Sequence, residues 1–254
     1  MTDMRYIDTH CHLDQYRDPL GVLRHAEGAG VVTIAVTDLP SHYQRLSMRM
    51  GRRKPVRVAI GMHPLRVPSA SAMELALFAE LLDDADYVGE VGLDGSQAGK
   101  DTLRNQRKVF EHLLQQPRIQ HKILTVHSRG AEADTIKALA DAGVTAVLHW
   151  YSGPLKHIDA ALAAGLWFSV NPAMLRSQNG QRIIAALPRD RVLTETDGPY
   201  SKLGGRASEP RDIPTVVRGL GRTWGEDEEQ ARARIFGNMA SVAAATGVSR
   251  SRMD

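Results

Sequence analysis

Six residues that can bind a metal ion lie within, or directly after, short strand-like runs of apolar residues. Four are histidines and two are carboxylates: His10, His12, His127, His149, Glu90 and Asp197. In a parallel α/β barrel the carboxyl ends of all strands meet at one rim, so side chains that are distant in sequence converge there. Imidazole and carboxylate groups are ligands for divalent ions. The pattern therefore predicts a metal-dependent hydrolase.

The first two histidines are two residues apart on a predicted strand. His10 and His12 should therefore share one face and bind one ion together, while Cys11 points the other way and is buried. Two histidines at this spacing are a weak signal alone, and the other four ligands strengthen it. Five further histidines lie on predicted helices or loops and are interpreted as structural or solvated: His25, His42, His112, His121 and His157.

The ligand set is large enough for two divalent ions. Ions about 3.5 to 4 Å apart usually share a carboxylate, and such a pair both activates water and neutralises charge on a leaving oxygen. We expect Glu90 to bridge them. His10, His12 and Asp197 would then complete the coordination of the first ion, and His127 with His149 would hold the second ion. Asp197 is alternatively the general base for the attacking water, and the two roles are compatible.

Two further residues are candidates for substrate contacts. His63, in Gly61-Met62-His63-Pro64, is placed to reach the same rim and to contact a phosphate oxygen or the leaving group. Its alternative role is that of a turn histidine fixed by Pro64. Arg129 carries a guanidinium, which beside a metal pair suits a phosphodiester. Asp94 is predicted to accept hydrogen bonds within its loop.

The positions of these residues depend on an alternation of strands and helices. Eight strand-like runs are predicted at residues 6–11, 31–36, 56–60, 87–91, 123–126, 146–148, 166–170 and 192–196. Helical stretches between them are predicted at 20–29, 73–82, 103–114, 133–142 and 156–164. This pattern predicts an α/β (β/α)8 TIM barrel forming a single domain over residues 1–254. A doubly wound open sheet is the alternative, but it normally has a glycine-rich turn after its first strand, and none stands there.

Glycines and prolines mark several boundaries of this pattern. Gly30, Gly143 and Gly165 each separate a helical stretch from the next strand, where a left-handed residue is favoured. The tail that begins at Glu209 and ends near Thr246 is predicted to form two closing helices.

Composition excludes few functions. The chain has 32 Lys and Arg against 29 Asp and Glu, a net charge of +3 that does not identify a nucleic-acid binder without a localised patch. The arginines near the C-terminal third are interpreted as a solvated face: Arg206, Arg211, Arg218 and Arg222. The N-terminal residues 1–5 lead into the first strand without an apolar signal region, and no run is long enough to span a bilayer. One cysteine fits a reducing, cytoplasmic location.

Several motifs together resemble the TatD family over nearly the whole chain. They are Ile7-Asp8-Thr9-His10-Cys11-His12-Leu13-Asp14, Gly61-Met62-His63-Pro64, Gly89-Glu90-Val91-Gly92-Leu93-Asp94, Val126-His127-Ser128-Arg129, His149 with Tyr151-Ser152-Gly153, Glu195-Thr196-Asp197-Gly198-Pro199-Tyr200, and Asn238. The resemblance implies a TIM-barrel hydrolase of the amidohydrolase superfamily that acts as a magnesium- or manganese-dependent deoxyribonuclease. It also implies that the same six residues are the ligands.

The chain departs from the family pattern at the substrate rim. Leu65 stands where the family often has a second histidine, and Gly95 where it often has an aromatic residue. Residues 12–19 and 92–96 are similar to the TatD-like member (QatD) of the Qat anti-phage systems. That similarity implies a role in defence beside partner proteins encoded in the same operon.

Three kinds of function fit these observations. The first is a phosphodiesterase that shortens single-stranded DNA from its 3′ end with two divalent ions, which are magnesium, manganese or zinc. The second is a metal-dependent amide or ester hydrolase, such as a deacylase. The third is a metal-stabilised binding subunit of a defence complex. A structural zinc site is disfavoured, because such sites are four-coordinate and rich in cysteine.

Overall fold

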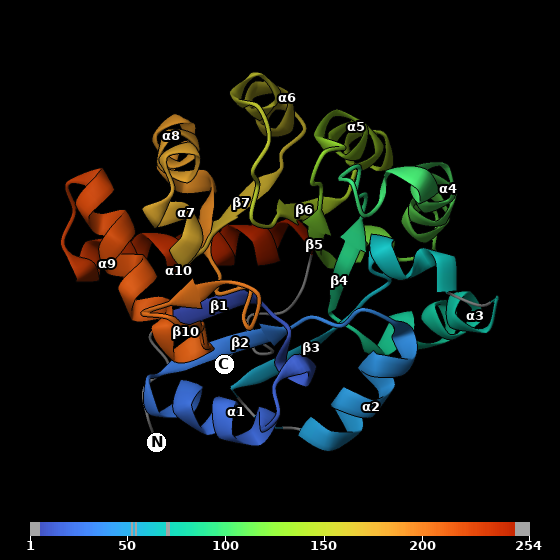
Figure 1. Ribbon diagram of the computed structural model, residues 1–254, viewed down its shortest axis with the longest axis horizontal. Helices are drawn as coiled ribbons and strands as arrows, with labels where there is room; N and C mark the ends of the chain where they lie inside the picture. Colours follow the sequence, from blue (N-terminus) through green and yellow to red (C-terminus); the bar gives the residue numbers. More distant parts are fainter. Residues whose placement is uncertain (1–5, 52, 54, 70–71, 247–254) are drawn as a thin grey trace.

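Eight parallel strands form one sheet in which neighbouring strands follow the order of the chain (Figure 1). The computed structural model describes residues 6–51, 53, 55–69 and 72–246. The predicted (β/α)8 barrel is confirmed. The strands are β1 (Tyr6–Cys11), β2 (Val31–Ala35), β3 (Val56–Ile60), β4 (Tyr87–Gly92), β5 (Ile123–His127), β6 (Thr145–Leu148), β7 (Trp167–Val170) and β8 (Val192–Thr194).

Helices surround the sheet on its outer side, except that α10 crosses one end of the barrel (Figure 1). They are α1 (Pro19–Gly28), α2 (Pro40–Met50), α3 (Ala72–Leu81), α4 (Leu103–Leu114), α5 (Glu132–Ala142), α6 (Ile158–Ala163), α7 (Pro172–Arg176), α8 (Gln178–Ala186), α9 (Ile213–Trp224) and α10 (Glu228–Thr246). The predicted helices agree within one or two residues, and the two closing helices are confirmed. Helices α2, α7 and α8 were not predicted, nor was the hairpin of β9 (Lys202–Leu203) and β10 (Arg206–Ala207).

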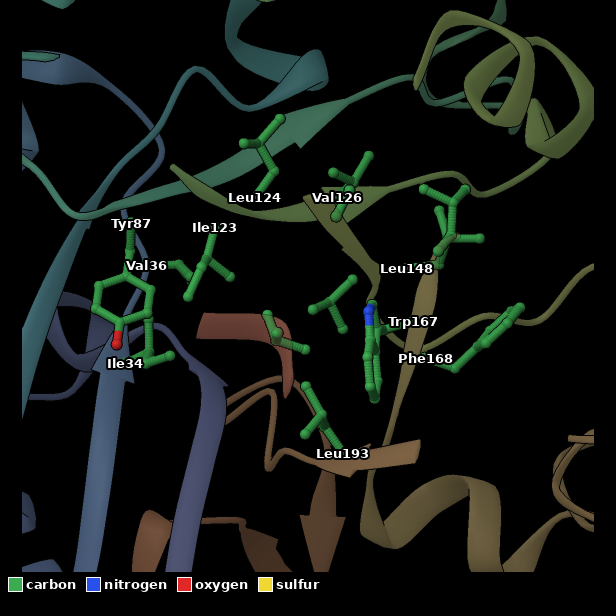
Figure 2. Close-up of a cluster of buried hydrophobic side chains, with 14 of the residues drawn as sticks. Ile34, Val36, Tyr87, Ile123, Leu124, Val126, Leu148, Trp167, Phe168 and Leu193 are labelled. Atoms are coloured by element: carbon green, nitrogen blue, oxygen red, sulfur yellow. The ribbon is translucent and has the colours of Figure 1, made fainter. Parts of the chain in front are cut away.

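The strands form because they are rich in β-branched and aromatic residues that are buried on both faces, as parallel strands require. Figure 2 shows Ile34, Ile123, Leu148, Phe168 and Leu193, which bring together side chains from five strands. Helix α10 contacts β1, β5, β6 and β8, so it crosses the end of the barrel away from the carboxyl rim. The hydrophobic core thus includes the barrel interior between α10 and that rim, and it extends outward to the surrounding helices, for example to Phe78 of α3 and Phe110 of α4.

The first and last strands meet through side chains and loop backbone. Thr194 donates its hydroxyl to the Ile7 carbonyl at 2.6 Å, and Thr9 donates to the Thr194 carbonyl at 3.0 Å. Above them, Asp197 N donates to His10 O at 2.8 Å, and His12 N donates to Gly198 O at 2.8 Å. We call these last two hydrogen bonds the closing junction. Three predicted ligands lie on it.

Two strands change register where they carry predicted ligands. The pairing of β1 with β2 shifts between Asp8 and Cys11, and that of β4 with β5 shifts between Val88 and Val91. Such irregularities change the direction in which a side chain points. Gly92 then has φ +130°, and a Cβ there would lie 2.1 Å from the carbonyl oxygen of His127. Only glycine allows this approach of the two strands.

Other local predictions have clear outcomes. Gly30, Gly143 and Gly165 all have positive φ, which confirms them as left-handed residues before a strand. Cys11 is fully buried, as expected. The expectation about residues 1–5 lies outside the described part of the chain. Among the described helices, none has both the length and the apolar character needed to span a bilayer.

Asn238 ties α10 to the start of β8 and provides a test of barrel closure. Its side-chain amide donates to Arg189 O at 2.8 Å and to Val192 O at 2.7 Å. We expect Asn238→Ala to lower the free energy of unfolding by about 1–3 kcal/mol, because the buried Val192 carbonyl and the partly buried Arg189 carbonyl lose their donor. Urea denaturation measures the change. The control Asn179→Ala removes an exposed amide bound to Ser152 O and should cost less than about 0.5 kcal/mol. Equal losses of unfolding free energy in the two variants would show that Asn238 has no special role in barrel closure.

Candidate metal centre

Glu90 lies at the middle of a buried group of histidines, and its two carboxylate oxygens face different sides. On one side, Glu90 Oε2 lies 3.0 Å from His12 Nε2 and 3.5 Å from His10 Nε2. Those two ring nitrogens are only 3.3 Å apart. The predicted shared face of the β1 histidines is therefore present.

The other oxygen of Glu90 faces three more histidines. Glu90 Oε1 lies 2.7 Å from His127 Nδ1, 2.8 Å from His149 Nε2 and 3.3 Å from His63 Nε2. The ring of His149 also stacks on that of His10 at 3.8 Å between centroids. The predicted convergence of strand ends thus extends to His63, at the end of β3.

Asp197 completes the side of the cluster formed by the β1 histidines. Its Oδ1 lies 3.6 Å from His10 Nε2 and 3.6 Å from His12 Nε2. The Asp197 backbone has φ 46°, a left-handed conformation that is uncommon outside glycine and is found at functional sites. The closing junction holds this backbone in place.

These atoms fit divalent ions. There are three sets of residues in which the possible ligand atoms lie within 4.8 Å of one another. They are His10 with Glu90 and His149, His10 with His12 and Asp197, and His63 with Glu90 and His127. Asp197 Oδ1 is buried and has no hydrogen-bond partner among the described residues. A buried carboxylate oxygen without a partner is costly, and a cation between it and the imidazoles removes that cost. Glu90 belongs to two of the sets, which agrees with a bridging position.

A second layer of side chains orients the inner histidines. Thr125 Oγ1 lies 2.6 Å from His10 Nδ1, Asp94 Oδ2 lies 2.8 Å from His127 Nε2, and Asp38 Oδ1 lies 3.5 Å from His12 Nδ1. Such partners fix the ring and its tautomer in metal sites. Neither Thr125 nor Asp38 was predicted from the sequence. Asp38 follows β2, so the rule that identified Asp197 after β8 would have found it.

Glu195 supports the loop that carries His149. It is fully buried and accepts hydrogen bonds from Ser169 Oγ at 2.5 Å, from Trp150 N at 2.9 Å and from Asn171 Nδ2 at 3.0 Å. Burial raises the pKa of Glu195 to about 7. It stands 3.9 Å from His149 Nδ1. The sequence analysis gave it no role, although it lies in the same motif as Asp197.

The carboxylates of the cluster differ in their affinity for protons. Burial alone would raise the pKa of Glu90, but His63 and His149 hold it well below its ordinary value. Burial raises the pKa of Asp197 to about 7, and the negative charge of Glu90 adds to the effect. One carboxylate is thus held ionised while the other can hold a proton near neutral pH.

The remaining candidates lie at different depths. Arg129 is exposed beside the buried Ser128, on the loop after β5, and does not enter the buried cluster. Asp94 accepts a hydrogen bond from Ser96 N at 2.8 Å, as expected for a loop anchor, and it also contacts His127. The five histidines interpreted as structural or solvated lie on helices α1, α2 and α4 and on two short 3-10 turns.

A closed set of parallel strands with histidines and carboxylates at its carboxyl rim is the architecture of a metal-dependent hydrolase. The family model described as TatD-related DNase matches residues 7–243. The chain belongs to this family and is a metal-dependent hydrolase. The resemblance drawn from the sequence motifs is thereby confirmed.

Individual relatives agree with this assignment. An uncharacterized metal-dependent hydrolase from Methanocaldococcus jannaschii is 24% identical over 248 residues, covering 94% of this chain and 96% of the relative. The deoxyribonuclease TATDN3 from Homo sapiens is 30% identical over 213 residues, covering 76% of this chain and 77% of the relative. The crystal structure of YjjV, a TatD homolog from Escherichia coli K12, superposes with a TM-score of 0.84 at 23% identity, covering 94% and 98% of the two chains. The similarity to YjjV supports the fold alone.

Proton competition provides a test of the metal centre. Burial alone would lower the pKa of His127, but hydrogen bonds to Asp94 and Glu90 raise it to about 9. The ring is therefore protonated below that pH, and an ion that binds it must displace the proton. We expect manganese affinity to fall as pH is lowered, by about tenfold per unit below 9 for one displaced proton. Calorimetry in buffers of different ionisation enthalpy measures both affinity and proton release.

Asp94→Asn is the matched variant for this measurement. It removes a charge that raises the pKa of His127, so the fall in affinity should begin at a lower pH than in the wild type. Affinity that is independent of pH, without proton release, would show that His127 is not a ligand.

Proposed function

We propose that this enzyme hydrolyses phosphodiester bonds of single-stranded DNA, from the 3′ end, at a dinuclear site bridged by Glu90. The observation that carries the proposal is the division of histidine nitrogens between the two oxygens of Glu90. His10, His12 and Asp197 would hold one ion, and His127 with His149 the other. Magnesium, manganese and zinc all suit this mixed ligand set.

Bound ions at such a site supply Lewis-acid catalysis and neutralise charge on the phosphate. The chain itself supplies the proton transfer. Asp197 accepts the proton of the attacking water on its carboxylate, which suits a pKa of about 7 near neutral pH. His63, whose ring is partly exposed and lies 3.3 Å from Glu90 Oε1, contacts a phosphate oxygen or the leaving oxygen. Proton uptake and leaving-group contact thus fall to residues on opposite sides of Glu90.

The exposed positive charges at the carboxyl rim of the barrel support a polyanionic substrate. Exposed cations lie in the segments that follow four different strands: Arg66, Arg129, Arg176 and Lys202. Exposed cations around a catalytic site attract and position a phosphate backbone, and they make binding sensitive to salt. Arg129 is the member of this group that we assign to substrate binding.

Digestion of single-stranded DNA labelled at its 5′ end tests the proposal. We expect cleavage that requires a divalent ion and a product ladder that shortens from the 3′ end. Glu90→Ala should abolish it, and Asp197→Asn should lower kcat about 10²- to 10⁴-fold through loss of the proton acceptor. Asp101→Asn, on the exposed rim after β4, is the control and should retain activity. If DNA is not cleaved but an aminoacyl ester or small amide is hydrolysed, the assignment of the metal centre would stand and the substrate bond would be an ester or amide instead.

We further propose that the enzyme acts in anti-phage defence beside partner proteins of its operon. The support is the similarity of residues 12–19 and 92–96 to the TatD-like member of the Qat systems. Plaque formation on cells carrying the whole operon is the measurement. Asp197→Asn should abolish protection because it removes chemistry, whereas Asp101→Asn should protect fully. Full protection by Asp197→Asn would indicate a binding subunit instead.

A further inference from the structure

Tyr200 is an exposed aromatic side chain beside the metal centre. Its side chain is 55% exposed, whereas Asp197 is 4% and Ser201 is 2% exposed. A single exposed apolar residue needs no explanation in general. Tyr200 differs because it is three residues from a predicted ligand and touches another: its ring meets that of His12 edge to face, with centroids 5.0 Å apart.

The surrounding chain holds Tyr200 in a fixed position. Its N–H donates to Asp197 O at 2.9 Å. The next residue, Ser201, donates its hydroxyl to Thr196 O at 2.6 Å, and its Oγ lies 2.8 Å from Ser208 Oγ. An aromatic ring fixed before binding loses little conformational entropy when a ligand stacks on it. The exposed ring therefore has the properties of a stacking platform.

The turn after β3 approaches His12 as well, through Asp38. Arg66 Nε donates to Asp38 Oδ2 at 3.2 Å, and the other oxygen of Asp38 lies 3.5 Å from His12 Nδ1. The guanidinium is half exposed, and Leu65 beside it is 38% exposed. His12 is thus the common neighbour of the Tyr200 ring and of the Asp38–Arg66 ion pair. The Tyr200 ring and the Arg66 cation thus lie on the same side of the site, and the exposed Leu65 is next to Arg66 in the chain.

We propose that Tyr200, with Leu65 and Arg66, forms a subsite for one unpaired nucleobase and its adjoining phosphate. The base stacks on Tyr200, since every base has a π-face and stacking tolerates any sequence. Arg66 pairs with the phosphate as a cation already held in place by Asp38. This inference rests on the proposed function and specifies how the DNA end is held.

The subsite has a consequence for substrate choice. A base that stacks on protein must leave its neighbours and its partner strand, which costs less in single-stranded DNA than in a duplex. Tyr200 would therefore favour single-stranded ends. Its contribution belongs to binding, so loss of the ring should raise KM for single-stranded DNA and leave kcat at saturation nearly unchanged.

A double-mutant cycle, with one change in the protein and one in the DNA, tests the contact between Tyr200 and the terminal base. Wild type and Tyr200→Ala are compared on an oligonucleotide with an intact 3′-terminal nucleotide and on one whose terminal nucleotide lacks its base. Binding is measured by fluorescence anisotropy with a phosphorothioate linkage that resists cleavage, and KM with the ordinary linkage. We expect each single change to weaken binding about tenfold, and both together to weaken it no further, because the two changes remove the same contact.

Matched variants separate stacking from structure. Tyr200→Phe keeps the ring and should bind within about twofold of wild type. Tyr200→Leu keeps apolar bulk against His12 without an aromatic plane and should behave like Tyr200→Ala, which keeps the test valid if the alanine variant unfolds. Met48→Ala removes a side chain that is 71% exposed on α2 and should change nothing.

The outcomes distinguish two failures. If wild type cleaves DNA but the effects of Tyr200→Ala and of the missing base multiply, or if Tyr200→Ala has no effect, the subsite is wrong and the nuclease stands. If wild type neither binds nor cleaves the unmodified oligonucleotide, the proposed nuclease function fails and the subsite fails with it.

Discussion

Asp197 donates its backbone N–H to His10, and His12 donates its own to Gly198. This closing junction brings the loop after the last strand against the end of the first strand. Beneath it, hydroxyl groups of Thr9 and Thr194 join the two strands. The same contact closes the barrel and brings together three of the residues predicted to bind metal. A change that loosens it would therefore affect folding and metal binding together, which makes the geometry of the centre dependent on the whole barrel.

Opposed electrostatic effects in a small buried volume govern the centre. Glu90 is kept ionised by the histidines around it, while burial of Asp197 favours its protonated form. Burial and the ring of His149 lower the pKa of His10, whereas contacts with Asp38 and Glu90 raise that of His12 against the effect of its burial. Neighbouring groups of the same type thus differ in charge. In the proposed mechanism, bound cations would replace these protons with fixed positive charge, and Asp197 would accept the proton of the attacking water.

Strand positions and the inner histidines could be predicted from the sequence because both depend on local rules. Apolar runs mark the strands, and residues at the ends of parallel strands share a rim. Thr125 could not be found this way, since it reads as an ordinary strand residue until β5 is placed beside His10. The register shifts near His10 and Glu90 depend on the neighbouring strand and leave no mark in periodicity. Helix α7 has only five residues and begins at Pro172 after its Asn171 cap. Ser177 alone separates it from α8, so the two short helices share no continuous helical period.

Buried and exposed parts of the site are built by different means, and this separates chemistry from substrate choice. The inner histidines and Glu90 are held by strands, by Thr125 and Asp94, and by dense packing, so little can change there without loss of the centre. The rim is made of short turns whose side chains project into solvent, such as those carrying Leu65 and Tyr200. Because these side chains lie on the rim, changes in them can alter which substrate end is held without moving the buried histidines or Glu90.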